Sequence, residues 1–587
     1  MRCETSFFSL TLYKKHLTRN WPLWAAHLGL WLLILPVQLW NQHIHGDLNS
    51  FVRNHPMDSL SVLFPWLAFV AALVAVVVFF HLFKSNAANF IGALPLRREG
   101  VFLTAFAAGY TMLVGPLLVV TLVTILLESI LGILAPEILV FLAAGALNSF
   151  FWLSFAASCC VISAHAVAAV AFYFIFNWIV PVMVALVEGL LSGFLYGFVG
   201  FGAGFYEGAA WLCPVLQLVR HNWRGGMGFD DWNMLAIYAA VGFLMTLCAV
   251  GLHHIRKAER SGDLIVFDPI KWLFKICVTV CGGMGFGTFL TIIVFDSMQL
   301  NEGWKFGICC AVAAFICYMV SEMLLAKSFK VWKHWKGAVI SAVAFVLVVA
   351  AVDMDWIGFT TRVPDPASVK SVTATFGGSG ISGSAGNGLK FTGEDVKAVT
   401  DLHRYLVEHR EDIGYGDEYY LSLNLEYKLG WTTLRRQYRS WYAPGDEEHR
   451  LLNAALGKGD SSFPYDRGTP NHLSFSLCVS GENGDDAEYI GWEINTEDNK
   501  AVWDAVAADM LAGRYVLRST PGEEELNTGE LEAQWINNYA IVGGGQERQF
   551  YTLRLSPELT ETWKTLKERG YLDRRVVSAS WGVETVG

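Results

Sequence analysis

The chain has 587 residues, of which 53% are hydrophobic and 16% are charged, and its mean hydropathy is +0.38. This composition lies outside the range of soluble globular proteins and indicates a membrane protein. Residues 1–352 carry 20 Lys and Arg against 16 Asp and Glu, whereas residues 353–587 carry 23 against 37. The acidic second part argues against nucleic acid as a partner, because phosphate backbones bind basic surfaces.

Residues 5–20 combine an apolar side with a basic end that contains Lys14, Lys15 and Arg19. This pattern predicts a helix that lies in the membrane interface before the chain enters the bilayer.

Nine apolar segments follow in residues 1–352. A spanning helix needs about 20 apolar residues. We therefore predict a polytopic α-helical membrane domain, residues 1–352, with spans at about 21–40, 60–83, 101–126, 138–160, 166–188, 233–252, 272–295, 304–326 and 337–352.

Basic residues concentrate in alternate loops between these segments. The N-terminal segment, the second loop, the loop after the sixth span and the loop before the ninth span are rich in Lys and Arg. Because basic loops stay in the cytoplasm, we predict that the N-terminus is inside the cell. Nine spans then place residues 353–587 outside, and a miscount by one would place them in the cytoplasm.

Glycines recur between the fifth and sixth spans, at positions 189, 193, 197, 200, 204 and 208. Small residues at such spacing let helix backbones approach closely in lipid. Close packing of a half-helix is the favoured interpretation, and a re-entrant element that lines a pathway is the alternative.

Three acidic residues lie within or near the spans: Glu128, Glu188 and Glu322. Acids in the membrane are costly and often functional, so each is a candidate for contact with a substrate or ion. Glu128 and Glu188 fall at the outer ends of their spans, and Glu322 lies about one turn from an inner end, close to Lys327. An interfacial acid with a local partner is the favoured interpretation.

No catalytic or metal-binding motif stands out: the chain lacks H-E-x-x-H, G-x-S-x-G, C-x-x-C and a Walker A loop. The glycine-rich segment 282–287 lies inside a span and predicts helix packing rather than nucleotide binding. We therefore expect a protein that is not an enzyme and that holds no metal or cofactor of its own.

Residues 353–587 predict a soluble α+β domain. Thr392 and Asp395 predict a capping box before an amphipathic helix that contains His403, which we expect at the helix surface or partly buried. Alternating apolar residues at 421–427 predict a strand that pairs with 431–442. Further helices are expected at 495–510 and 556–570, the second with Ser556 as N-cap, Pro557 in its first turn and Gly570 past its end.

Three membrane-domain segments and the start of the soluble part carry a family resemblance. The loop at 88–109 reads ANFIGALPLRREGVFLTAFAAG, and further similarity lies at 253–275, 321–337 and 358–373. The first segment resembles the cytoplasmic loop of ABC-2-type exporter permeases, in which Leu-Pro and an Arg precede a span. The second resembles a block in one subgroup, with Ser261 where Ala is usual. The last resembles the junction to an uncharacterised C-terminal domain in Gram-positive bacteria.

The resemblance implies a separate ATPase subunit that binds ATP and Mg²⁺ and docks on a coupling helix between the second and third spans. Arg97 and Arg98 are alternatively contacts to lipid phosphates. The implied docking residues are Leu94, Pro95, Arg97, Arg98, Glu259, Gly262 and Asp263.

The resemblance thus implies a permease subunit of an ATP-driven exporter in the plasma membrane. A second copy or a related permease would complete it, and the cargo would be a lipid, peptide or drug. The alternative is a membrane sensor or resistance component with an extracytoplasmic ligand-binding domain. A membrane-embedded enzyme is disfavoured by the missing motifs.

Overall fold

The computed structural model divides the chain into two compact units, residues Met1–Leu190 with Phe201–Ala350, and residues Leu191–Gly200 with Ala351–Gly587. The sequence predicted one domain boundary, between residues 352 and 353. The structure places the boundary close to that point, at Ala350/Ala351, and also assigns the short segment Leu191–Gly200 to the second unit. The structure describes residues 8–45, 48–93, 96–133, 135–220, 229–256, 262–295, 303–378, 388–410, 419–430, 432–443, 446–458, 460–461, 468–479, 488–512, 529–538, 546–555 and 559–571.

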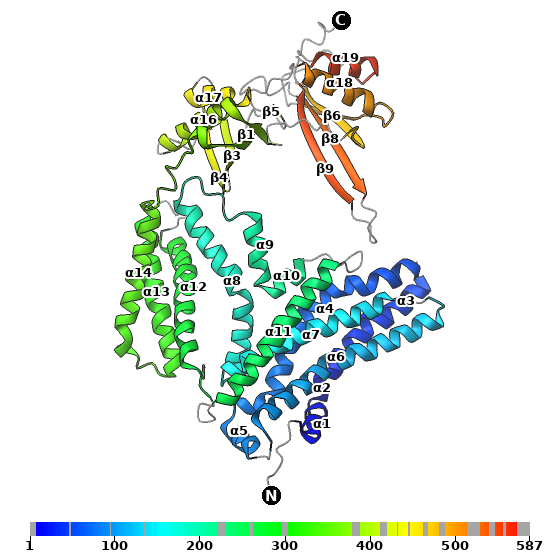
Figure 1. The fold of residues 1–587 in the computed structure, drawn as a ribbon, viewed down its shortest axis with the longest axis vertical. Coiled ribbons are helices and arrows are strands. Elements are labelled where there is room, and N and C mark those ends of the chain that lie inside the picture. Colours follow the sequence, from blue (N-terminus) through cyan, green and yellow to red (C-terminus); the bar gives the residue numbers. More distant parts are fainter. Residues whose placement is uncertain are drawn as a thin grey trace. The chain divides into compact units, whose positions relative to one another are not determined.

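The first unit consists of helices (Figure 1). They are α1 (Leu10–Arg19), α2 (Trp21–Leu32), η1 (Leu33–Val37), α3 (Gln38–His45), α4 (Leu48–Val78), η2 (Phe80–Leu82), α5 (Ser85–Gly92), α6 (Arg98–Ile130), α7 (Glu137–Ile162), α8 (Ala166–Phe194), α9 (Ala203–Trp211), α10 (Pro214–Arg220), α11 (Phe229–Ile255), α12 (Asp268–Phe295), α13 (Gly303–Ala326), η4 (Trp332–His334) and α14 (Trp335–Asp353).

Nine helical segments among the described residues are long and apolar enough to cross a bilayer, which confirms the polytopic fold class. The first span includes a π-helical turn at η1, which contains Pro36 and so lacks one backbone donor. The ninth is longer than expected because η4 extends it. The spans are Trp21–Ile44, Asn54–Val78, Arg98–Ile130, Glu137–Ile162, Ala166–Phe194, Asp231–Ile255, Asp268–Phe295, Gly303–Ala326 and Trp332–Asp353.

The glycines of α12 are packing positions, as the sequence predicted for 282–287. A Cβ at Gly287 would lie 2.6 Å from the sulfur of Cys310, and one at Gly282 would lie 2.6 Å from the sulfur of Cys317. Helices α12 and α13 therefore approach closely through small residues on one face.

The glycines between the fifth and sixth spans behave differently, and three of them make no close packing contact within the described residues of this chain. A Cβ added at Gly189, Gly204 or Gly208 would meet nothing within 4 Å. Gly197 does have a close neighbour: its φ is +83°, and an added Cβ would lie 2.7 Å from the Tyr438 ring. Only a glycine at position 197 lets the segment after α8 lie this close to Tyr438, which belongs to a strand of the second unit (Thr432–Tyr442).

The second unit contains a five-stranded antiparallel sheet with strand order β4-β3-β1-β2-β5. Strands β3 and β4 form the hairpin predicted from alternating residues, with Leu429 opposite Thr432. Helices α16 (Val396–Glu408) and α17 (Glu447–Leu456) share its apolar core. The strands are β1 (Ser371–Gly378), β2 (Leu389–Phe391), β3 (Tyr419–Leu429), β4 (Thr432–Tyr442) and β5 (Asp460–Ser461).

A second sheet has the order β7-β6-β8-β9 and its own core with helices α18 (Asn499–Leu511) and α19 (Thr560–Glu568). The soluble part therefore has two cores. Helix α18 begins four residues later than predicted. Its strands are β6 (His472–Val479), β7 (Glu488–Glu493), β8 (Gly529–Asn538) and β9 (Gln546–Leu555).

Capping in the soluble unit differs from the sequence prediction. Thr392 makes no side-chain cap bond, and a 3-10 turn, η6 (Gly393–Asp395), precedes α16. The N-terminal end of helix α19 is capped by a residue of another helix. The buried Asp509 of α18 accepts hydrogen bonds from the backbone nitrogens of Glu561 and Thr562. The predicted cap residues Ser556 and Pro557 lie outside the described residues, and Gly570 follows the helix with φ +78°.

His403 is fully buried, so its predicted place at the helix surface is wrong. Its Nδ1 lies 3.0 Å from the Tyr427 hydroxyl and its Nε2 lies 2.7 Å from the Tyr438 hydroxyl. Burial, together with nearby Arg436 and Arg404, lowers the pKa of His403 to about 3. A neutral imidazole offers one donor and one acceptor, so these two hydroxyls satisfy it and the group is structural.

Candidate functional site

The candidate site lies at one end of the helical unit, where the second, fourth and sixth spans end and the third, fifth and seventh begin (Figure 1). Segments η2 and α5 connect the second span to the third at this end. Two of the four resembling segments, 88–109 and 253–275, reach it. Loops at helix ends are where a partner subunit can act on several spans at once.

Arg256 follows the last residue of α11 and is buried, with 6% of its surface exposed. Its Nη1 donates to the carbonyl oxygens of Cys160, Val161 and Ser163, at 2.8–3.1 Å, and its Nη2 donates to that of Leu82 at 2.8 Å. The last carbonyls of a helix lack intrahelical partners and carry partial negative charge, so a cation is well placed there.

Burial lowers the pKa of Arg256 to about 10. The guanidinium therefore remains charged at pH 7, and its donors stay on these four carbonyls. One side chain thus holds together the ends of the second, fourth and sixth spans.

The start of the third span is attached to the same point. Arg98 donates from Nη1 to the carbonyl oxygens of His254 and Arg256, at 3.0 and 3.3 Å. Glu99 places Oε1 2.6 Å from Nδ1 of His254. The predicted docking residue Arg98 therefore holds α6 to the end of α11, and it remains exposed beside Arg97.

Gly262 and Asp263 form the second predicted contact, and the structure attaches them to the turn between α7 and α8. Gly262 has φ +96° and donates to the Ala164 carbonyl, while the Ala164 nitrogen donates to that of Asp263, each at 3.1 Å. The Asp263 carboxylate lies 2.8 Å from Nζ of Lys327. The remaining predicted docking residues, Leu94, Pro95 and Glu259, lie outside the described residues.

Arg256 was not among the predicted site residues, because in the sequence it is one of several basic residues in the loop after the sixth span. The distinguishing signal was its position directly after the last turn of a span, where a cation can cap the helix. His81 and His253 were also missed: both are buried, and their ring centroids lie 6.4 Å apart.

The three predicted intramembrane acids do not meet one another, and each has a local contact. The backbone nitrogen of Ala135 lies 3.4 Å from Glu128. The Tyr206 hydroxyl donates to Glu188. Glu322 pairs with Nζ of Lys275 at 2.5 Å, whereas Lys327 pairs with Asp263.

The described residues contain no group of three or more His, Cys, Asp or Glu side chains that could hold a metal ion. The helix-end cluster, which we define as Arg98, Glu99, His254 and Arg256 with the backbone carbonyls that the two arginines contact, is a network of hydrogen bonds and one ion pair. Such an arrangement can transmit a displacement between helices, because its hydrogen bonds connect four spans.

The fold and this cluster define a multi-pass membrane protein with a soluble α+β part. No model of a known protein family matches the sequence, and no curated protein matches it either.

Proposed function

We propose that the chain is the permease subunit of an ATP-driven exporter of the ABC-2 type in the plasma membrane. Separate ATPase subunits would bind ATP and Mg²⁺, and a second permease copy or a related permease would complete the transporter. The observation that supports this most directly is Arg256, which connects the carbonyl of Leu82, three residues before α5, to the ends of α7 and α11.

The mechanism follows from these contacts. An ATPase that closes on ATP would press on α5, and the adjoining Leu82 would carry the displacement to Arg256. Because packed helices shift between discrete arrangements rather than deform continuously, a small push on the loop can move whole spans. The cargo would be a lipid, peptide or drug-like molecule, and the chain itself would catalyse no reaction.

Copurification in mild detergent tests this proposal: an ATPase should accompany the chain. Asn86 and Asn89 lie exposed on α5, so Asn86→Trp or Asn89→Trp adds bulk there without disturbing a core. We expect either change to remove the ATPase from the purified complex. Thr18→Trp, at an exposed position of α1, is the control and should retain it. An unchanged ATPase yield with both α5 variants would contradict docking at this helix.

A sensor is the second candidate, and a different observation favours it. The segment after α8 lies against the first soluble sheet: Gln437 donates its backbone nitrogen to the carbonyl of Gly197 at 3.1 Å. The segment after α14 reaches the same strand, since the Arg436 guanidinium lies 3.7 Å from the Phe359 ring centroid. A ligand that altered β4 would act on the ends of two spans.

A sensor would respond without any ATPase. The soluble part has a net charge of −14, so oligolysine is a suitable probe for a cationic peptide ligand. If the chain is a sensor, binding of oligolysine to the soluble part should slow hydrogen exchange in residues 191–200 of the isolated full chain. No change in exchange would leave the exporter as the better account.

A further inference from the structure

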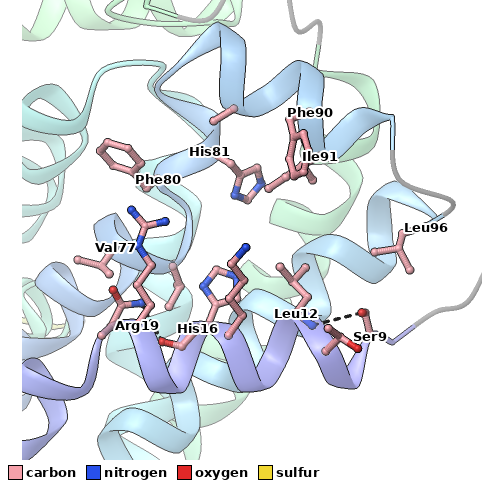
Figure 2. Close-up of a pocket in the computed structure, with 15 residues that line it drawn as sticks. Ser9, Leu12, His16, Arg19, Val77, Phe80, His81, Phe90, Ile91 and Leu96 are labelled. Carbon is pink, nitrogen blue, oxygen red and sulfur yellow. Dashed lines mark hydrogen bonds between the residues drawn. The ribbon is translucent and has the colours of Figure 1, made fainter.

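A cavity of about 710 Å³ lies between α1, the end of α4, η2 and α5. Figure 2 shows His16 and Arg19 reaching from α1 toward Phe80 and His81, with Phe90 and Ile91 of α5 nearby. The cavity borders the start of the first span, the end of the second and the start of the third. Because these are the ends of candidate spans, we expect the cavity to lie where the bilayer meets water.

Four basic side chains line this cavity, Lys15, His16, Arg19 and His81, and none of its lining residues is acidic. Burial lowers the pKa of His16, and the charges of Arg19 and Lys15 lower it further. Because burial also lowers the pKa of His81 to about 3, both histidines are neutral at pH 7, and the positive charge of the cavity comes from Lys15 and Arg19, with no acidic residue in the lining to offset it. An anion would be stabilised there, since partly buried charges are screened less than those at an open surface.

His81 provides an independent sign of a missing ligand. Its side chain points into the cavity and only 8% of the residue is exposed, yet Nε2 has no hydrogen-bond partner among the described residues (Figure 2). Buried polar atoms in folded proteins nearly always have a partner. A polar ligand in the cavity would supply one.

Apart from Ser9, Thr11 and Asn20, the remaining wall is apolar, and it includes Leu12, Val77, Phe80 and Ile91. Phe90 also lines the cavity and is 67% exposed. A small inorganic anion would leave this surface uncovered. A molecule with both a charged group and a hydrocarbon chain would use both kinds of wall, and the bilayer supplies such molecules at this depth.

We propose that the cavity binds a phospholipid with an anionic headgroup. The phosphate contacts Lys15 and Arg19, the headgroup supplies the partner that Nε2 of His81 lacks, and an acyl chain lies against Phe80 and Ile91. The bound lipid would hold α1 to α5 and so set the position of the loop between the second and third spans. This site does not depend on the proposed transport function.

Binding of fluorescent phosphatidylglycerol to the purified full chain in detergent tests the proposal, with phosphatidylcholine as the zwitterionic comparison. We expect phosphatidylglycerol to bind at least about tenfold more tightly, and Lys15→Gln or Arg19→Gln to weaken it about fivefold each. Lys14→Gln removes the same charge from the same helix outside the cavity and should leave binding unchanged. Equal binding of the two lipids, or an equal effect of Lys14→Gln, would overturn the proposal.

Two further measurements separate the ligand sources and the role of His81. Inorganic phosphate should fail to displace the lipid at millimolar concentration; displacement would assign the cavity to a free anion instead. His81→Phe keeps the ring and removes the unpaired nitrogen, so it should weaken lipid binding several-fold without lowering thermal stability. Lower stability with unchanged lipid affinity would give His81 a structural role and contradict its part in the site.

Discussion

Arg256 is the residue on which the helix-end cluster depends. Arg256→Met would leave the carbonyls of Cys160, Val161, Ser163 and Leu82 buried without this donor. Because a buried acceptor left without its donor costs about 1–3 kcal/mol, we expect a clear fall in the unfolding temperature in detergent. Arg256→Lys should restore part of the loss, since an ammonium can reach fewer of the four oxygens.

The control for Arg256 is Lys271→Met at the start of the seventh span. Lys271 pairs with Asp268, whose side chain is 67% exposed. Such a surface pair contributes at most about 1 kcal/mol, so the unfolding temperature should hardly change. Equal losses at Arg256 and Lys271 would contradict the central role of Arg256.

A second prediction concerns a single residue, Gly197. Gly197→Ala would place a methyl group against Tyr438 at a φ of +83°, which L-residues rarely adopt. We expect a loss of about 1–3 kcal/mol from strain and overpacking, seen as faster hydrogen exchange in β4. Gly208→Ala in α9 is the control, because its added Cβ meets nothing within 4 Å and should be neutral or slightly stabilising.

At the scale of elements, α12 and α13 are joined by glycine packing and by the pair Lys275–Glu322. Glu322 has a side chain only 6% exposed, whereas Lys327 and Asp263 are 51% and 40% exposed. Double-mutant cycles on unfolding temperature should therefore give a coupling above about 1.5 kcal/mol for Lys275–Glu322 and below about 1 kcal/mol for Lys327–Asp263. Similar couplings for the two pairs would show that burial does not strengthen the first.

The elements that sequence predicted well are those whose signal is local. A run of about 20 apolar residues is long enough to cross the bilayer, whatever the rest of the chain does. The alternation of apolar and polar residues at 421–427 follows from the two faces of a single strand, one buried and one exposed. What sequence missed depends on distant partners. Arg256 meets Leu82 174 residues earlier in the chain, and Asp509 caps a helix 51 residues later. His403 looked exposed because its partners, two tyrosine hydroxyls, lie on strands further along the chain.

At the scale of the whole molecule, the odd number of spans and the basic loops predict that the soluble unit and the loop before the ninth span lie on opposite sides of the membrane. The N-terminus and that loop should be inside. Single cysteines introduced at exposed Lys397 and exposed Lys330 test this. A membrane-impermeant maleimide should label Lys397→Cys in intact cells and Lys330→Cys only after permeabilisation.

The control is the same pair of variants labelled after complete lysis, where both should react equally if both positions are exposed. The reverse pattern in intact cells would place the soluble unit in the cytoplasm. It would also move α5 and the Arg256 cluster to the outer face, where no ATPase could reach them. Because the exporter proposal needs α5 in the cytoplasm and the sensor proposal needs the soluble unit outside, this one experiment bears on both.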